Sequence, residues 1–284
     1  MSGGEEKMFF FPGSGGRRLL GFLHLPEINS TAQANIGMVH CHPFGEEKMA
    51  SHSIATKTAR ALCNLGVTVI RFDYSGTGDS EGELDEVTLH DWHQDLSLAI
   101  KYLKANSSVE KVGLWGLRLG AHLALRYAAT EQDFDPACLI LWQPVFEPEA
   151  FFKQFLRQKL STEIATQTAG GLGVKGMVAE LEKGISQEVI GYPISESMYK
   201  SFTTSTVTFP LPSHSRYPIL LTSNSMAEEI PLGIKKNADA LNAAGHSVQL
   251  EHIVEEPYWD RHWRWDAPKL TQVTVDFMKR IRTL

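Results

Sequence analysis

The chain has 284 residues, of which 43% are hydrophobic and 21% charged, and its formal net charge at pH 7 is −6. This length and composition are typical of a globular chain with a large buried core, and they exclude a disordered one. The negative charge balance argues against nucleic acid and anionic membranes as main partners, because both require a basic binding surface.

The chain shows no targeting or membrane signal. Residues 1–16 are acidic and contain only a very short apolar run, unlike a secretory signal peptide, and no stretch of about 18 consecutive apolar residues predicts a membrane span. Three cysteines, an odd number, stand inside apolar segments, which favours buried free thiols over disulfides: Cys41, Cys63 and Cys138. We therefore expect a cytoplasmic protein.

The first predicted element is a β-hairpin over residues 8–25, where two apolar runs flank a turn. From residue 36 onwards, apolar strands alternate with amphipathic helices. The expected strands are 36–42, 67–74, 109–116, 137–144, 217–224 and 247–254, and the expected helices are 51–66, 89–106, 120–130, 231–245 and 267–284. Continuously apolar strands interleaved with helices predict a parallel sheet that is covered on both faces.

The alternation breaks between residues 147 and 215, where turn residues, a glycine-rich piece and polar helix-like stretches follow one another. The chain contains no internal repeat and no linker between two cores. These features predict one α/β domain over residues 1–284 with a lid-like insertion at 147–215.

Two short motifs support a more specific fold. Residues 71–80, RFDYSGTGDS, are similar to the D-x-x-G-x-G-x-S stretch that follows the fourth strand in α/β-hydrolases. Residues 116–120, GLRLG, stand between a strand and a helix, where the G-x-S-x-G nucleophile elbow of that superfamily belongs. The chain thus resembles the α/β-hydrolase fold, which implies a mostly parallel central sheet, helices on both faces and a lid insertion after the sixth strand.

Arg118 occupies the place of the nucleophilic serine in this elbow. A guanidinium stays protonated and only donates hydrogen bonds, so it cannot attack an acyl carbon. Glu228 is the candidate acid, displaced from its usual position, and His262 is either the candidate base or a loop histidine packed among aromatic residues. The triad-equivalent candidates are therefore Arg118, Glu228 and His262. The alternative is an active esterase or thioesterase with a relocated nucleophile, Ser75 or Ser225.

The elbow also predicts an anion site. It stands at a helix N-terminus, and the resemblance places oxyanion-type backbone N–H groups at Leu119 and near Phe44, with His42 beside them. Two interpretations of Arg118 remain open. Its guanidinium binds a carboxylate, phosphate or sulfate group of a ligand, or it is neutralised within the chain by Glu46, Glu47 or Glu228.

Other clusters give weaker signals. His40 and His42, two residues apart, with His52 downstream, suggest a metal site. Because no third convergent ligand stands at helical spacing, we expect His40 to end its strand and His42 to line the pocket. We expect no metal and no cofactor. A group of tryptophans favours packing, or the wall of a sugar or acyl site: Trp259, Trp263 and Trp265.

A narrower resemblance rests on three motifs: HPFGEEKMASH at 42–52, the arginine-bearing GLRLGA at 116–121, and PYW at 257–259. Together they resemble the type 2 hydrolase-like proteins associated with the exosortase A system, where a P-P-F-x-E-E stretch stands in place of residues 42–47. The resemblance implies a role near bacterial exopolysaccharide export or surface display, without defining a reaction. Together with the missing nucleophile, it favours a pseudoenzyme that binds a small anionic, acyl or sugar ligand or a protein partner. A third hypothesis is an interaction protein whose lid carries the contact surface.

Overall fold

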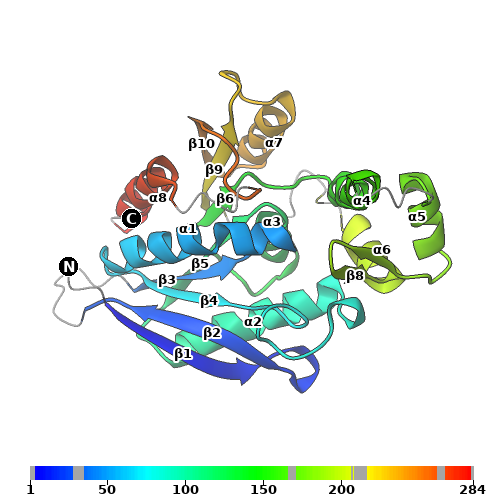
Figure 1. Ribbon diagram of the computed structural model, residues 1–284. Coiled ribbons are helices and arrows are strands. Elements are labelled where there is room, and N and C mark those ends of the chain that lie inside the picture. Colours follow the sequence, from blue (N-terminus) through cyan, green and yellow to red (C-terminus); the bar gives the residue numbers. More distant parts are fainter. Residues whose placement is uncertain are drawn as a thin grey trace.

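An eight-stranded sheet runs through the middle of the computed structural model (Figure 1). The structure describes residues 4–27, 35–165, 171–205, 207, 216–260 and 266–282. The strands of this sheet are β1 (Glu5–Pro12), β2 (Arg18–Leu25), β3 (Ile36–Cys41), β4 (Thr68–Phe72), β5 (Lys111–Leu117), β6 (Leu139–Trp142), β9 (Pro218–Ser225) and β10 (Ser247–Val254). Their spatial order is β1-β2-β4-β3-β5-β6-β9-β10.

The sheet is mostly parallel. The opening hairpin pairs β1 with β2, and β2 pairs with β4, both antiparallel. All pairings from β4 to β10 are parallel. Since the carboxyl ends of parallel strands meet at one edge, the loops after β3, β4 and β5 lie together there. This is the α/β-hydrolase fold, as the sequence predicts.

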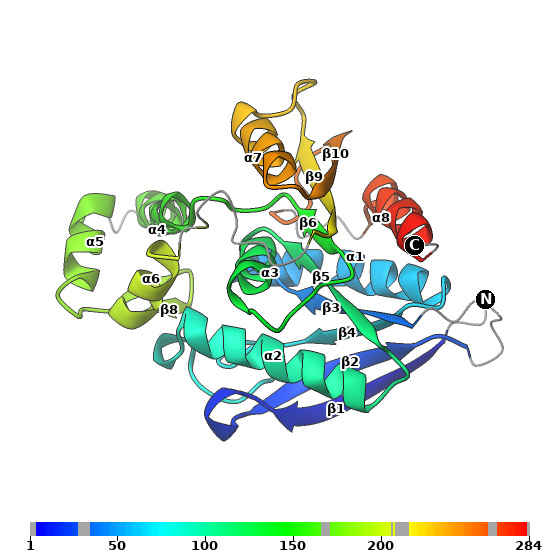
Figure 2. The ribbon, with the colours of Figure 1, turned by 180° about the vertical axis from the view of Figure 1, so that it is seen from behind.

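Helices cover both faces of the sheet, which explains why β3 to β6 are almost entirely buried. In Figure 1, α1 and α8 lie across one face, and Figure 2 shows α2 and α3 on the opposite side. The helices are α1 (Glu46–Cys63), α2 (Leu89–Ala105), α3 (Leu119–Thr130), α7 (Leu232–Ala243) and α8 (Pro268–Ile281), with short turns η1 (Ser14–Gly16) and η2 (Leu84–Glu86). Each face has its own apolar core.

The segment between β6 and β9, after the sixth strand, forms the insertion. It contains α4 (Pro148–Ala165), α5 (Val174–Leu181), the hairpin of β7 (Gln187–Val189) and β8 (Tyr192–Ile194), and α6 (Glu196–Thr203). Both views show these elements at one side of the molecule. Within the described residues, no helix combines the length and apolar character that crossing a membrane requires.

The first helix begins earlier than the sequence predicts. We expected it from residue 51, but α1 starts at Glu46, directly after Gly45. Gly45 has φ 56°, a conformation that glycine adopts without strain, so the chain turns sharply there and enters the helix at once. This early start places Glu46, Glu47 and Lys48 on the first turn of α1, beside the carboxyl edge of the sheet.

Candidate functional site

The elbow, residues 116–120, is a tight turn between β5 and α3. Arg118 has φ 55° and ψ −118°, an unusual conformation for a non-glycine residue, and its N–H donates to the Trp142 carbonyl oxygen at 2.9 Å. A Cβ on Gly116 would lie 2.5 Å from Ala121 Cα, and one on Gly120 would lie 2.1 Å from the Cys41 carbonyl oxygen. Both glycines are therefore required for this close packing.

The side chain of Arg118 pairs with Glu47. Arg118 Nε donates to Glu47 Oε1 at 3.1 Å, and the side chains are 17% and 19% exposed. The guanidinium carbon lies 5.3 Å from the centre of the Trp259 ring and 5.7 Å from that of Phe151. Burial raises the pKa of the Glu47 carboxyl, while the charge of Arg118 opposes this shift. The arginine is thus held between a carboxylate and two aromatic rings.

The neighbouring Glu46 faces a different partner, since its carboxylate accepts a hydrogen bond from the Tyr192 hydroxyl at 3.0 Å. Little space remains at the elbow. A cavity of about 40 Å³ lies beside Arg118, and the first turn of α1 and the side chains of α4 line it. Phe44 and Leu119 are buried there, at 2% and 1% exposure. Such a space holds water molecules but no organic ligand.

The predicted acid, the predicted base and the two alternative serine nucleophiles do not gather around Arg118 in the described residues. Glu228 is exposed on the loop after β9, and His262 lies outside the described residues, as do Trp263 and Trp265. Ser75 is fully buried, with its N–H donating to Asp95 Oδ2 at 2.8 Å. The Ser225 hydroxyl faces the Ala227 carbonyl oxygen at 3.5 Å. In the described residues, neither serine has an imidazole as hydrogen-bond partner.

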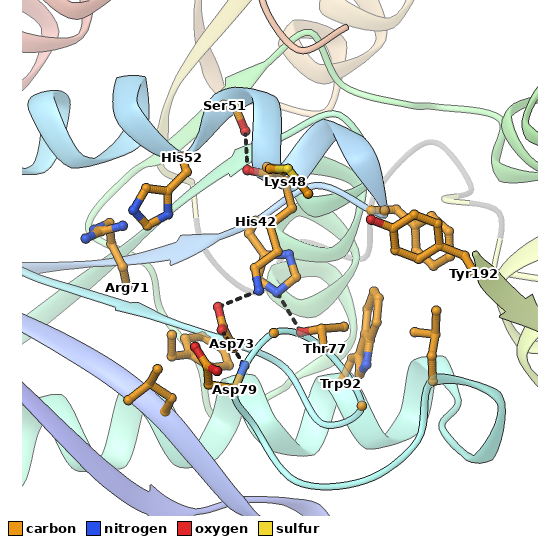
Figure 3. Close-up of a pocket in the computed structure, with 18 of the residues that line it drawn as sticks. His42, Lys48, Ser51, His52, Arg71, Asp73, Thr77, Asp79, Trp92 and Tyr192 are labelled. Carbon is orange, nitrogen blue, oxygen red and sulfur yellow. Dashed lines mark hydrogen bonds and ion pairs between the residues drawn. The ribbon is translucent and has the colours of Figure 1, made fainter. Parts of the chain in front are cut away.

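A much larger cavity, of about 540 Å³, lies next to the elbow on the other side of the loop that follows β3. This large cavity lies between α1, the middle of β2, the carboxyl ends of β3 and β4, the loop 73–79, and the β7–β8 hairpin. Figure 3 shows Arg71 and His52 together at one end, Trp92 and Tyr192 at the other, and His42 between them. Its volume suits a small organic molecule.

Asp73 joins two walls of the large cavity. Its carboxylate pairs with Lys48 Nζ of α1 at 2.7 Å and accepts from the Asp79 N–H at 3.2 Å. Ser80 connects the same loop to the sheet, because its hydroxyl donates to the Asp73 carbonyl oxygen and accepts from the Leu20 N–H. The D-x-x-G-x-G-x-S stretch therefore forms a braced wall of this cavity.

His42 is a neutral, structural side chain here. Its Nδ1 lies 2.7 Å from the Pro43 carbonyl oxygen, which can only accept, so Nδ1 carries the proton and Nε2 is the acceptor. Nε2 faces the Tyr74 N–H and the Thr77 hydroxyl, each at 3.3 Å. Burial lowers the pKa of His42 to about 3. His42 thus lines the large cavity rather than the space at Arg118.

The three histidines considered for a metal all line the large cavity, but they come from β3, the loop after it and α1. His40 packs against Trp115, with the two tilted rings 4.3 Å apart between centres, while His52 is exposed on α1. Among the described residues, no group of three or more histidine, cysteine or acidic side chains is placed to hold a metal ion.

Arg71 is a charged residue of the large cavity for which the sequence predicts no role. It is only 8% exposed, and its Nε donates to His24 Nε2 at 3.0 Å. The sequence signal was present: an arginine in the otherwise apolar strand TVIRF, whose side chains are all buried. A charge in such a strand requires an explanation, because burying an ion costs free energy.

The comparisons with known proteins agree with this fold. The model of the family described as serine aminopeptidase, S33, matches residues 38–186, which is more than half of the chain. Among curated proteins, the human protein ABHD12B is 34% identical over 96 residues, covering 34% of this chain and 25% of that protein. The match therefore spans about a quarter of the curated relative.

Solved structures resemble the whole chain. Est1E from Butyrivibrio proteoclasticus, in a structure with bound ferulic acid, has a TM-score of 0.66 and 16% identity, covering 97% of this chain and all of that one. The mouse alpha/beta hydrolase domain-containing protein 10 has a TM-score of 0.59 and 18% identity, covering 97% and 99%. At these identities the likeness concerns the fold.

Proposed function

The chain belongs to the serine aminopeptidase S33 family of α/β-hydrolases, and on that premise we propose that it binds a small anionic ligand without hydrolysing it. Arg118 in place of the elbow serine is the observation that carries this proposal. Acyl transfer in this fold needs a nucleophile at the elbow, and arginine has neither a lone pair to attack with nor a proton to lose at neutral pH.

The space at the elbow supports the same conclusion. Glu47 neutralises Arg118, and the side chains of α4 leave about 40 Å³ beside it. In the proposed function, α4 then acts as a cover over the elbow. Ligand binding is the remaining role, since the large cavity of about 540 Å³ is of ordinary size for a small molecule.

A serine-directed fluorophosphonate probe tests the absence of hydrolysis. We expect no covalent labelling of the purified protein at neutral pH, with an active serine esterase labelled in the same mixture as the control. Labelling of any serine in this chain would overturn the proposal, and sequencing of the labelled peptide would identify a relocated nucleophile, such as Ser75 or Ser225.

The variant Arg118→Ser separates the elbow from the rest of the site. We expect it to show no more ester hydrolysis than the wild type, because Glu47 and the phenylalanines of α4 still fill the elbow. Hydrolysis that appears only in this variant would show that an acid and a base are already in place, and would point to recent loss of an active enzyme.

We further propose that this ligand belongs to exopolysaccharide or exosortase-linked metabolism in a bacterium. The support is the resemblance of the three motifs at 42–52, 116–121 and 257–259. In a host that makes an exopolysaccharide, deletion of the gene should reduce polymer on the cell surface, and wild-type protein should restore it. Normal polymer in the deletion strain would separate the protein from this pathway.

A further inference from the structure

We propose that the large cavity is a binding site for a hydrophobic monocarboxylate, with Arg71 holding the carboxylate and the aromatic end of the cavity holding the apolar body. This inference rests on the proposed function, because it requires that the chain binds an anionic ligand. It assigns that ligand to Arg71 rather than to Arg118.

Arg71 reaches the cavity from the sheet. In the strand register, Arg71 of β4 lies between Phe22 of β2 and His40 of β3, and the three share one face of the sheet, the face that α1 covers. Residues 48, 51, 52 and 55 of α1 line the opposite wall at helical spacing. Arg71 is thus buried between a sheet and a helix, with the cavity beside it.

No carboxylate in the described residues lies within ion-pair distance of the Arg71 guanidinium. Among the described residues, Arg71 makes one side-chain hydrogen bond, from its Nε to Nε2 of His24. Because arginine can only donate, this nitrogen is an acceptor, and burial lowers the pKa of His24 to about 4, so the imidazole is neutral. The ring of Phe22, 5.4 Å from the guanidinium carbon, supplies a further weak contact.

The guanidinium therefore has free donors and no carboxylate in contact, because Glu6 and Asp73 act on it only from beyond ion-pair distance and Glu6 Oε1 lies 3.4 Å from Nδ1 of His24. Arginine has five N–H donors in a planar fork, and Nε uses one of them. A carboxylate matches this fork with two parallel hydrogen bonds, which is the strongest neutralisation that a small ligand can offer. Since a buried cation with only distant counter-charges is costly, the site favours an anion that enters the cavity.

His52 is a second donor at the same end. It lies beside Arg71 in Figure 3, and its ring has no hydrogen bond to the described residues. Burial and the charge of Arg71 both lower the pKa of His52. An anion placed between the two side chains would offset the effect of the Arg71 charge on the pKa of His52. The His52 ring could then carry a proton and donate to the ligand.

Glu6, whose Oε1 lies 3.4 Å from His24 Nδ1, acts on Arg71 through space but does not line the cavity. Lys48 and Asp73 neutralise each other at 2.7 Å in the middle of the cavity, and the acidic Asp79 and Glu83 are exposed at its rim. Apolar side chains make up most of the remaining wall: Phe44, Ala55, Phe72, Leu84, Trp92, Tyr192 and Pro193. One deep cation and a long apolar wall fit a molecule with one anionic head and a hydrophobic body.

Isothermal titration with matched pairs of compounds tests the site in the wild-type protein. The probes are 3-phenylpropanoate and octanoate, each beside its own primary amide, which keeps the body and removes the charge. We expect each carboxylate to bind at least about tenfold more tightly than its amide, as a charge-assisted pair requires. Equal affinity of carboxylate and amide would overturn the inference.

Variants then locate the cation. Arg71→Gln should weaken carboxylate binding by about tenfold or more and leave amide binding unchanged, whereas Arg71→Lys should retain part of the preference. Arg18→Gln is the matched control, because Arg18 is an exposed arginine of β2 outside the cavity, and it should change neither affinity. Thermal unfolding of each variant establishes that it is folded.

Arg118→Gln distinguishes the two cationic sites. Loss of carboxylate binding in this variant, with binding retained in Arg71→Gln, would move the anion to the elbow and overturn the present inference while leaving the proposed function intact. Fluorophosphonate labelling would instead overturn the proposed function, because it would show hydrolysis. It would leave the inference intact, because the preference for a carboxylate at Arg71 does not depend on a nucleophile.

Discussion

Arg118 at the elbow and Glu47 on the first turn of α1 form an ion pair, with 3.1 Å between Nε and Oε1, at the turn that the sequence predicts to be the nucleophile elbow. The two residues are 71 positions apart in the chain, so the pair connects the loop after β5 to the helix after β3. Both side chains are mostly buried, and each therefore depends on the other for charge compensation.

This dependence predicts strong coupling. Glu47→Gln should lower the free energy of unfolding by about 2–3 kcal/mol, because Arg118 is left without a counter-ion. Arg118→Met should also destabilise, since it leaves the Glu47 carboxylate unpaired. Urea unfolding of both single variants and the double variant measures the coupling, which we expect to be about 1–3 kcal/mol. Additive effects of the two substitutions would show that the pair contributes nothing.

The tight contact behind the elbow gives a second prediction. A Cβ on Gly120 would lie 2.1 Å from the carbonyl oxygen of Cys41 and 2.4 Å from that of His42. Backbone atoms cannot move aside as a side chain can, so Gly120→Ala should destabilise the protein by about 3 kcal/mol. Thermal or urea unfolding measures the loss.

Gly233 is the matched control for that substitution. It lies in α7 with open space where a Cβ would stand, so Gly233→Ala should stabilise the protein by about 0.5–1 kcal/mol through helix propensity. If Gly120→Ala unfolded at the wild-type temperature, the elbow would not be packed as described.

The sequence predicted the sheet and the elbow because both have local signatures. Apolar strands alternate with amphipathic helices, and the glycines at 116 and 120 mark the turn around Arg118. Choosing among Glu46, Glu47 and Glu228 was beyond sequence reasoning. Adjacent residues on a helix point in different directions, so the start of α1 at residue 46 decides which glutamate faces the elbow.

The large cavity depends on contacts that no local pattern contains. Arg71, His52 and Tyr192 line it from a strand, a helix and the inserted hairpin. A single buried arginine in β4 was the available signal, but its meaning depends on whether a described carboxylate contacts it, which is a property of the folded chain. The sequence gives the charge, whereas the fold determines what surrounds it.

The cysteines provide a third prediction. Cys41 and Cys138 are fully buried and Cys63 is 6% exposed, and burial raises the pKa of each thiol to about 12. Because the thiolate is the reactive form, the native protein should react with a thiol reagent such as DTNB only at the rate of unfolding. The unfolded protein in guanidinium is the control and should release a signal for three thiols. Rapid reaction of a thiol in the native protein would contradict this packing.

Buried histidines give the last prediction, which concerns pH. Burial lowers the pKa of His24 and His122 to about 4 and that of His42 and His93 to about 3, whereas all four titrate near 6.5 in the unfolded chain. Below pH 6.5 the unfolded state therefore binds more protons than the native state, so the free energy of unfolding should fall as pH falls through this range. Glu47 and Asp95, whose pKa values burial raises, oppose this trend only where carboxyl groups titrate.

Urea unfolding at several pH values between about 7.5 and 5.5 measures how the free energy of unfolding depends on pH. A double variant, His93→Asn with His122→Asn, should show a shallower dependence. Stability that stays constant or rises as pH falls over this interval would mean that these imidazoles are accessible to protons in the native state.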